Sequence, residues 1–163
     1  MMAKSHMIIG AAAWIVFSKL THTPVSVLLA IVAMGASLLP DMDHPKSMFG
    51  QLIKPVSIVI SGIFGHRGIT HSFLAIFLIG FLMWKYGGVG QGLISAVSIG
   101  YLSHLFADFL TPHGVPLMYP LKTKFRFLLT FKTGGIGESL IAGCAGLFII
   151  YAICSPAVFT FKI

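Results

Sequence analysis

The sequence has very few charged side chains. Only 9% of its 163 residues are charged, while 56% are hydrophobic, and a soluble globular domain carries about 25% charged residues. This deficit excludes an ordinary soluble domain and indicates a protein of the membrane class. We expect one domain over residues 1–163, with an all-α fold: an integral membrane bundle of about five apolar helices plus one short helix.

Cysteine is also scarce. Cys144 and Cys154 both fall in the last apolar stretch, and their spacing fits neither a paired zinc site nor a disulfide framework. We interpret them as small apolar packing residues. The net charge of +7 does not predict nucleic-acid binding, because the basic residues are spread along loops and form no compact stripe with base-stacking aromatics. Basic loops beside apolar helices indicate topology signals or contact with anionic lipid headgroups.

The apolar residues fall into five long segments. A spanning helix needs about 20 apolar residues; the first and third segments are short, and Lys19 and Lys85 at their ends could snorkel to extend them. A sixth stretch, 55–65, is too short to cross, which predicts a re-entrant or interfacial helix. No convincing cleavage site follows the first segment, so we expect it to remain as a helix. The five segments are 7–20, 24–39, 72–84, 89–110 and 138–159.

Acidic and histidine side chains are few, and they gather in short polar motifs at the ends of apolar stretches. Three of the four carboxylates lie in these motifs. Acidic groups near lipid are rarely kept without a partner, and carboxylates mixed with imidazoles bind metals such as zinc, manganese or iron. The motifs are LPDMDHP at 39–45, HRGITHS at 66–72, HLFAD at 104–108 and TPHG at 111–114.

Two of these motifs place carboxylates where a cation is expected. His104 and Asp108 are four residues apart in a helical segment, so they share one face and can reach one metal ion; a hydrogen bond on the helix surface is the alternative. Asp41 and Asp43 follow an apolar segment that ends at Pro40. Negative charge at a helix C-terminus opposes the helix dipole, which favours metal binding over two solvated acids.

The motif at 66–72 is predicted to be a kinked loop that enters the third long segment. Thr70 or Ser72 could cap that helix. Free amides at the helix start suit a phosphate, and Arg67 could bind it with two hydrogen bonds. His66 and His71 are candidate metal ligands, with a structural histidine in a polar turn as the alternative for each.

The sequence does not decide the roles of three further features. His113 could be a metal ligand, a proton donor to a leaving group, or a surface residue. Glu138 opens the last segment, where the helix dipole alone would stabilise it; it could also be a ligand or a base. Residues 119–132 mix basic and aromatic side chains, which suits a membrane interface or a simple topology anchor, and the alternation over 124–131 is partly strand-like.

Threading five crossings through a bilayer places every candidate ligand on one side of the membrane. Basic residues mark the same side, where eight of them lie against three on the other. The positive-inside rule then makes the ligand side cytoplasmic. The eight are Lys4, Lys46, Lys54, Arg67, Lys122, Lys124, Arg126 and Lys132; the three are Lys19, Lys85 and Lys162.

In order and spacing, the runs LLPDMDHPKS (38–47), GHRGITHS (65–72), GYLSHLFAD (100–108) and LTPHGVP (110–116) resemble the YdjM family. His6 matches an early histidine of that family. The resemblance implies a multi-pass protein of the bacterial inner membrane that is a LexA-regulated, metal-dependent hydrolase, and so a link to the DNA damage response. A remoter similarity is to zinc-dependent phospholipase C and the P1-type nucleases, whose multinuclear zinc sites are built from histidines and aspartates.

These similarities and the motifs lead to one hypothesis, a hydrolase with one or two divalent ions, zinc or else manganese or iron. The substrate would be a phosphoester, plausibly a lipid phosphate or phospholipid, because the site would open at the membrane. Alternatives are a structural metal in a non-enzymatic membrane protein, and a metal transporter, which would need polar groups along a path through the membrane. The expected metal ligands are His6, Asp41, His66, His71, His104 and Asp108, and the expected catalytic residues are Asp43, Arg67, His113 and Glu138.

Overall fold

The computed structural model describes residues 1–65, 67–121 and 123–155. His66, Lys122 and Lys162 therefore lie outside the described residues. In the described part, the only β pairing is an isolated bridge between Val115 and Phe125, so the predicted all-α class is confirmed. The elements are α1 Ala3–Leu20, α2 Val27–Ala36, η1 Pro40–Asp43, α3 Met48–Leu52, α4 Lys54–Phe64, η2 Ile69–His71, α5 Phe73–Tyr86, α6 Gln91–Phe109 and α7 Ile136–Cys154.

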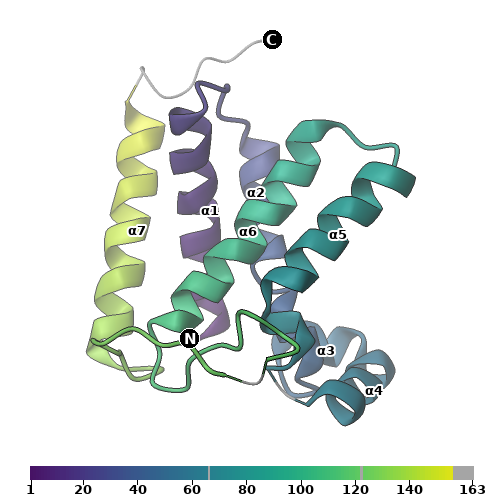
Figure 1. Cartoon of the computed structure of the whole chain (residues 1–163). Helices are drawn as coiled ribbons and strands as arrows, with labels where there is room; N and C mark the ends of the chain where they lie inside the picture. Colours follow the sequence, from purple (N-terminus) through teal and green to yellow (C-terminus); the bar gives the residue numbers. More distant parts are fainter. Residues whose placement is uncertain (66, 122, 156–163) are drawn as a thin grey trace.

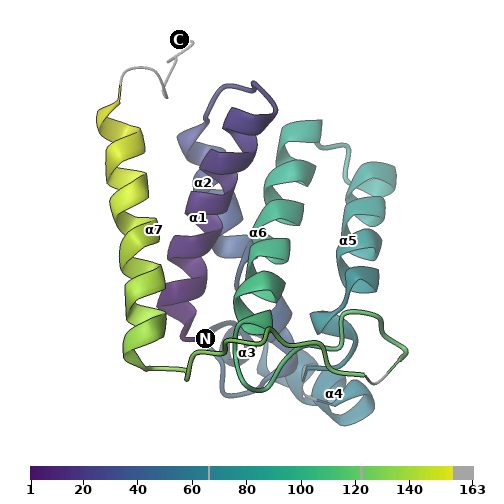
Figure 2. The same ribbon diagram turned by 60° about the vertical axis from the view of Figure 1, so that its left-hand side comes forward.

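The longer helices run alternately up and down in a bundle (Figure 1). α1, α2 and α6 pack on one another, while α7 packs on α1 and α5 packs on α6. The chain N-terminus, α3, α4 and the loop between α6 and α7 all lie at one end of the bundle (Figure 2). We call this the motif end, because η1, η2 and the last turn of α6 bring the polar sequence motifs there.

Small residues allow the three central helices to approach closely. Trp14, Ala33 and Ala96 form a buried cluster between α1, α2 and α6. A β-carbon added at Gly100 would lie 2.1 Å from the backbone oxygen of Ala33, and one at Gly10 would lie 2.9 Å from the same oxygen. Glycine is therefore required at these two contacts, as is common where helices pack within membranes.

The predicted set of five apolar spanning helices is not confirmed. Of the described helices, α6 and α7 are long and apolar enough to cross a membrane. α2 has 10 residues and α5 has 14, lengths of about 15 and 21 Å against a hydrocarbon core of about 30 Å. α1 is longer, but Lys4, His6 and Lys19 lower its mean hydropathy.

The motif end is closed by a short helix and a loop. α4 lies where the sequence predicts a short helix, at 55–65. It exposes Val59 and Ile63, in keeping with a helix too short to span. The strand-like alternation at 124–131 gives a loop instead of a strand. Its amides at Phe127 and Phe131 donate to the backbone oxygens of Phe109 and Leu110, because the last turn of α6 offers carbonyls that need partners.

We expect Gly100→Ala to destabilise the protein by about 1–3 kcal/mol, because the new methyl group would force α6 away from α2. Gly143→Ala in α7 is the matched control, since a β-carbon there meets no atom within 4 Å and alanine favours a helix. The measurement is thermal unfolding in detergent. Equal melting temperatures for Gly100→Ala and the wild type would show that the α2–α6 contact is not tight.

Candidate metal centre

Three separate segments bring imidazoles and carboxylates together at the motif end. Asp41 comes from η1, His71 from η2, and His104 and Asp108 from the last turns of α6. His71, His104 and Asp108 are buried, while Asp41 is 22% exposed. We call these four residues the donor cluster. The helical spacing of His104 and Asp108 does place them on one face, as their sequence positions predict.

In the donor cluster, the Nε2 atoms of the two histidines lie side by side and each carboxylate approaches both of them. Nε2 of His71 lies 3.3 Å from Nε2 of His104. Asp41 Oδ1 is 3.8 Å from each of these nitrogens, and Asp108 Oδ2 is 3.9 Å from each. Ligands about 2.0–2.1 Å from a tetrahedral zinc ion are about 3.3 Å apart. The two nitrogens therefore have the spacing of ligands on such an ion, and each carboxylate oxygen lies somewhat farther from them than that spacing.

Hydrogen bonds orient both imidazoles toward the centre of the cluster. Nδ1 of His104 lies 2.7 Å from the backbone oxygen of Ser37, so Nδ1 carries the proton and Nε2 keeps its lone pair. Nδ1 of His71 faces Asp43 Oδ2 at 3.4 Å and the hydroxyl of Thr70 at 3.1 Å. Such partners on the outer nitrogen are what metal-binding histidines require, because they fix the tautomer and the ring orientation.

Asp43 lies outside the donor cluster and holds its neighbours in place. It is fully buried, and its Oδ2 accepts hydrogen bonds from the Thr70 hydroxyl at 2.5 Å and the Arg67 amide at 2.8 Å. Tyr101 adds to this frame, because its hydroxyl donates to the backbone oxygen of Thr70. The carboxylate therefore links η1 to the turn that carries His71.

His6 provides a second group of donors beside the cluster. Its ring stacks on His104 with centroids 3.8 Å apart, and its Nε2 lies 3.4 Å from Asp108 Oδ1. Neither ring nitrogen of His6 has a well-formed hydrogen bond among the described residues, which is costly for a buried group. The donor atoms of His6, His104 and Asp108 lie close enough to hold an ion. His104 has one nitrogen to offer, however, so it can serve only one ion at a time.

Arg67 closes one side of the cluster. Its guanidinium lies 2.6 Å from Asp108 Oδ2, and its NH1 group lies 3.5 Å from the backbone oxygen of Gly114. The backbone of Arg67 has a φ of 59°, a left-handed conformation that is uncommon for residues other than glycine. Residues held in this way cluster at functional sites, and the Asp43 contact to the Arg67 amide helps to maintain it.

A cavity of about 540 Å³ opens beside the donor cluster. Asp41 of the cluster and the neighbouring Arg67 line it, and the exposed His113 and Lys124 also lie on its wall. We call it the polar cavity. Its basic side chains favour an anionic ligand. The lining residues are Met1, Ala3, Asp41, His44, Ser47, Met48, Arg67, His113, Lys124 and Thr133.

Glu138 is buried but lies in neither group of potential metal donors. Its Oε1 accepts hydrogen bonds from the Met2 amide at 2.7 Å and the Ser5 hydroxyl at 2.5 Å. Its Oε2 accepts one from the Gly134 amide at 2.7 Å. The carboxylate thus ties the start of α1, which carries His6, to the start of α7.

Several contributors to the site were not found in the sequence. The terminal amine of Met1 lies 2.6 Å from Asp108 Oδ1, and Ser37 orients His104 through its backbone. A backbone oxygen has no sequence signature, because every residue has one. His44 lies within the motif at 39–45 and Lys124 within the basic stretch 119–132, but their position on the polar cavity depends on how the loops fold.

Comparison with known proteins identifies close relatives along almost the whole chain. The family described as YdjM inner membrane protein matches residues 1–162. Inner membrane protein YdjM of Escherichia coli is 38% identical over 161 residues, which cover 91% of this chain and 80% of the relative, and the protein of the same name from Shigella flexneri matches equally. Uncharacterized protein YvsG of Bacillus subtilis is 36% identical over 116 residues, 71% of each chain.

No solved structure matches this chain significantly. The family match covers far more than half of the sequence, and three relatives exceed 30% identity over 71% or more of it. The polar motifs that form the donor cluster therefore lie within the part of the chain that the inner membrane protein family matches. This chain is a member of the YdjM inner membrane protein family.

Proposed function

We propose that this protein is a membrane-bound, metal-dependent hydrolase that cleaves a phosphoester, with a lipid phosphate or phospholipid as its substrate. One observation carries the proposal: two imidazole nitrogens 3.3 Å apart each lie 3.8–3.9 Å from an oxygen of Asp41 and from an oxygen of Asp108, next to a cavity with basic walls. Catalytic metal sites use such donors and keep a position open to substrate. Here the half-exposed Asp41 links the donor cluster to that cavity.

The donor set fits one divalent ion with a preference for nitrogen and oxygen ligands. Two imidazoles and two carboxylates suit zinc, and manganese or iron would also accept them. Such an ion supplies Lewis-acid chemistry, which activates water and polarises a phosphoryl oxygen. His6 and the second oxygen of Asp108 could contribute donors to another ion.

The other polar residues then have distinct tasks. Arg67 points its guanidinium at the edge of the cluster, where it could bind a substrate phosphate with two hydrogen bonds. His113, on the wall of the polar cavity, could protonate the leaving oxygen. Asp43 keeps the lone pair of His71 directed at the ion. Glu138 acts as a positioning residue for the start of α1.

A structural metal is the main alternative, and the exposure of the cluster speaks against it. Structural sites are coordinatively closed, whereas Asp41 is 22% exposed and lines the polar cavity. A transporter is less well supported still. Both groups of three potential metal donors among the described residues lie at the motif end, and a transport path needs polar groups through the bilayer.

We expect purified protein to contain about one equivalent of a divalent transition metal per chain, held by the donor cluster. His104→Ala and Asp41→Ala should each lower metal content about tenfold or more, because each removes a ligand. His22→Ala, at the opposite end of the bundle, is the histidine control, and Glu138→Gln should also keep its metal. Elemental analysis with a thermal melt checks this. Full metal content in His104→Ala would contradict the ligand assignment.

Arg67→Lys should raise KM for a phosphoester about tenfold while metal content stays unchanged, because a lysine keeps the charge but loses the paired hydrogen bonds. Arg126→Lys, on the exposed part of the same end, is the matched control. The assay measures phosphate release from phosphatidic acid in mixed micelles and from a water-soluble aryl phosphate, with phosphodiesters tested in parallel. Metal-loaded protein that hydrolyses none of these would refute the hydrolase proposal.

The positive-inside rule further leads us to propose a cytoplasmic site, with the short helices α2 and α5 crossing a locally thinned bilayer. In a variant without its two cysteines, the thiol introduced by His113→Cys should react with an impermeant maleimide only after cell lysis. The thiol introduced by His22→Cys should react in intact spheroplasts, because His22 lies at the other end and is exposed. The reverse pattern would place the site on the periplasmic face.

A further inference from the structure

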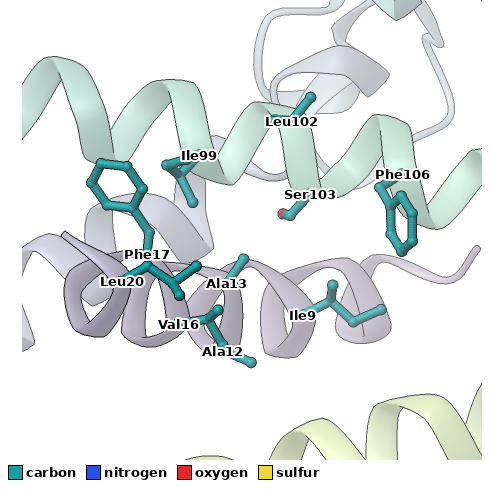
Figure 3. A pocket seen from close by; sticks show the side chains of 10 residues that line it. All are labelled: Ile9, Ala12, Ala13, Val16, Phe17, Leu20, Ile99, Leu102, Ser103 and Phe106. Atoms are coloured by element: carbon teal, nitrogen blue, oxygen red, sulfur yellow. The ribbon is translucent and has the colours of Figure 1, made fainter. Parts of the chain in front are cut away.

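An apolar groove runs between α1 and α6 on the surface of the bundle (Figure 3). Its volume is about 540 Å³. Ser103 is the single polar residue that lines it, and its hydroxyl donates to the backbone oxygen of Gly100 at 2.7 Å, so the groove offers carbon surface almost throughout. The lining residues are Ile9, Ala12, Ala13, Val16, Phe17, Leu20, Ile99, Leu102, Ser103 and Phe106.

The groove is long and narrow because of which residues line it. On α1 the lining residues recur every three or four positions from Ile9 to Leu20, which makes one stripe along the helix about 16 Å long. Ala13 and Ser103 face each other across its middle, while Phe17 and Phe106 lie toward its two ends (Figure 3). Small side chains thus leave room for a chain that lies parallel to the helices.

One end of the groove lies beside the donor cluster. Ile9 is three residues after His6 on α1, and Phe106 lies between His104 and Asp108 on α6. The start of α1 also forms part of the polar cavity, through Met1 and Ala3. The start of α1 therefore borders both the apolar groove and the polar cavity, while the end of α6 borders the groove and carries His104 and Asp108 of the donor cluster.

We propose that this groove binds a hydrocarbon chain of the lipid phosphate whose headgroup occupies the polar cavity. The proposal rests on the proposed function and names its substrate: a phosphoester that carries at least one long alkyl chain. Arg67 and Lys124 match the charge of the phosphate, and the groove matches the shape and polarity of the chain. The scissile bond would then lie where the groove meets the donor cluster.

Apolar surface alone would not select this lipid, because the bilayer is as apolar as the groove. Selection comes from the headgroup. Once the phosphate is held in the polar cavity, the attached chain is present at high effective concentration beside the groove. A neutral lipid with the same chain has no such anchor and would occupy the groove no more than any other lipid-facing surface.

The test uses photo-crosslinking of the full-length protein in detergent with two probes that carry a diazirine in the same chain, hexadecyl phosphate and the corresponding neutral alcohol. We expect the phosphate probe to label residues that line the groove about tenfold more than the alcohol does. Ala13→Trp, which fills the middle of the groove, should abolish this difference. Cys144→Trp, which adds the same bulk to an exposed position on α7, should not.

Equal labelling by the two probes, or unchanged groove labelling in Ala13→Trp, would overturn the proposal. Metal content and a thermal melt show whether each variant folds; if Ala13→Trp does not, Ile99→Trp blocks the groove from the facing helix. Hydrolysis is measured separately. Hydrolysis of a short-chain phosphate ester without groove labelling would refute only the proposed role of the groove. Specific groove labelling without hydrolysis of the short-chain or the long-chain ester would refute only the hydrolase proposal.

Discussion

The burial of ionisable side chains at one end of an apolar bundle is the constraint on which the rest of this structure depends. His71, His104, Asp43 and Asp108 are almost completely buried, although each is costly to remove from water. They persist because they pair with one another and with Arg67. Segments far apart in the chain must therefore meet at that end, and this requirement fixes how η1, η2 and α6 lie relative to one another.

The same constraint gives the site its chemical character. Two imidazoles with fixed outer hydrogen bonds bring their Nε2 atoms together, and an oxygen of each of two carboxylates lies near both nitrogens. Because Asp41 alone remains half-buried, the cluster has one open side, and there it meets the polar cavity. A buried ionic cluster that only braced the bundle would need no such opening.

Much of the site could be predicted because polar residues are conspicuous in an apolar sequence. The spacing of His104 and Asp108 determines that they share a helix face, and Ser72 does cap α5. The sequence predicted Asp41 as a metal ligand and Asp43 as a catalytic residue. It could not predict that Asp43 accepts hydrogen bonds from Thr70 and the Arg67 amide, because two residues in a tight turn differ only in where the turn points them. Helix lengths also escaped prediction: α2 ends at Ala36, since apolar composition alone does not say where a helix stops.

The sequence by itself determined the all-helical class, the membrane environment and the residue types available for metal binding, because hydropathy and helical spacing are local properties. The tertiary structure alone decided which donors meet and that a groove between α1 and α6 ends beside the cluster. It also decided that Glu138 ties α1 to α7 and is not one of the donors. These features depend on contacts between residues distant in the chain, which packing of the whole bundle sets.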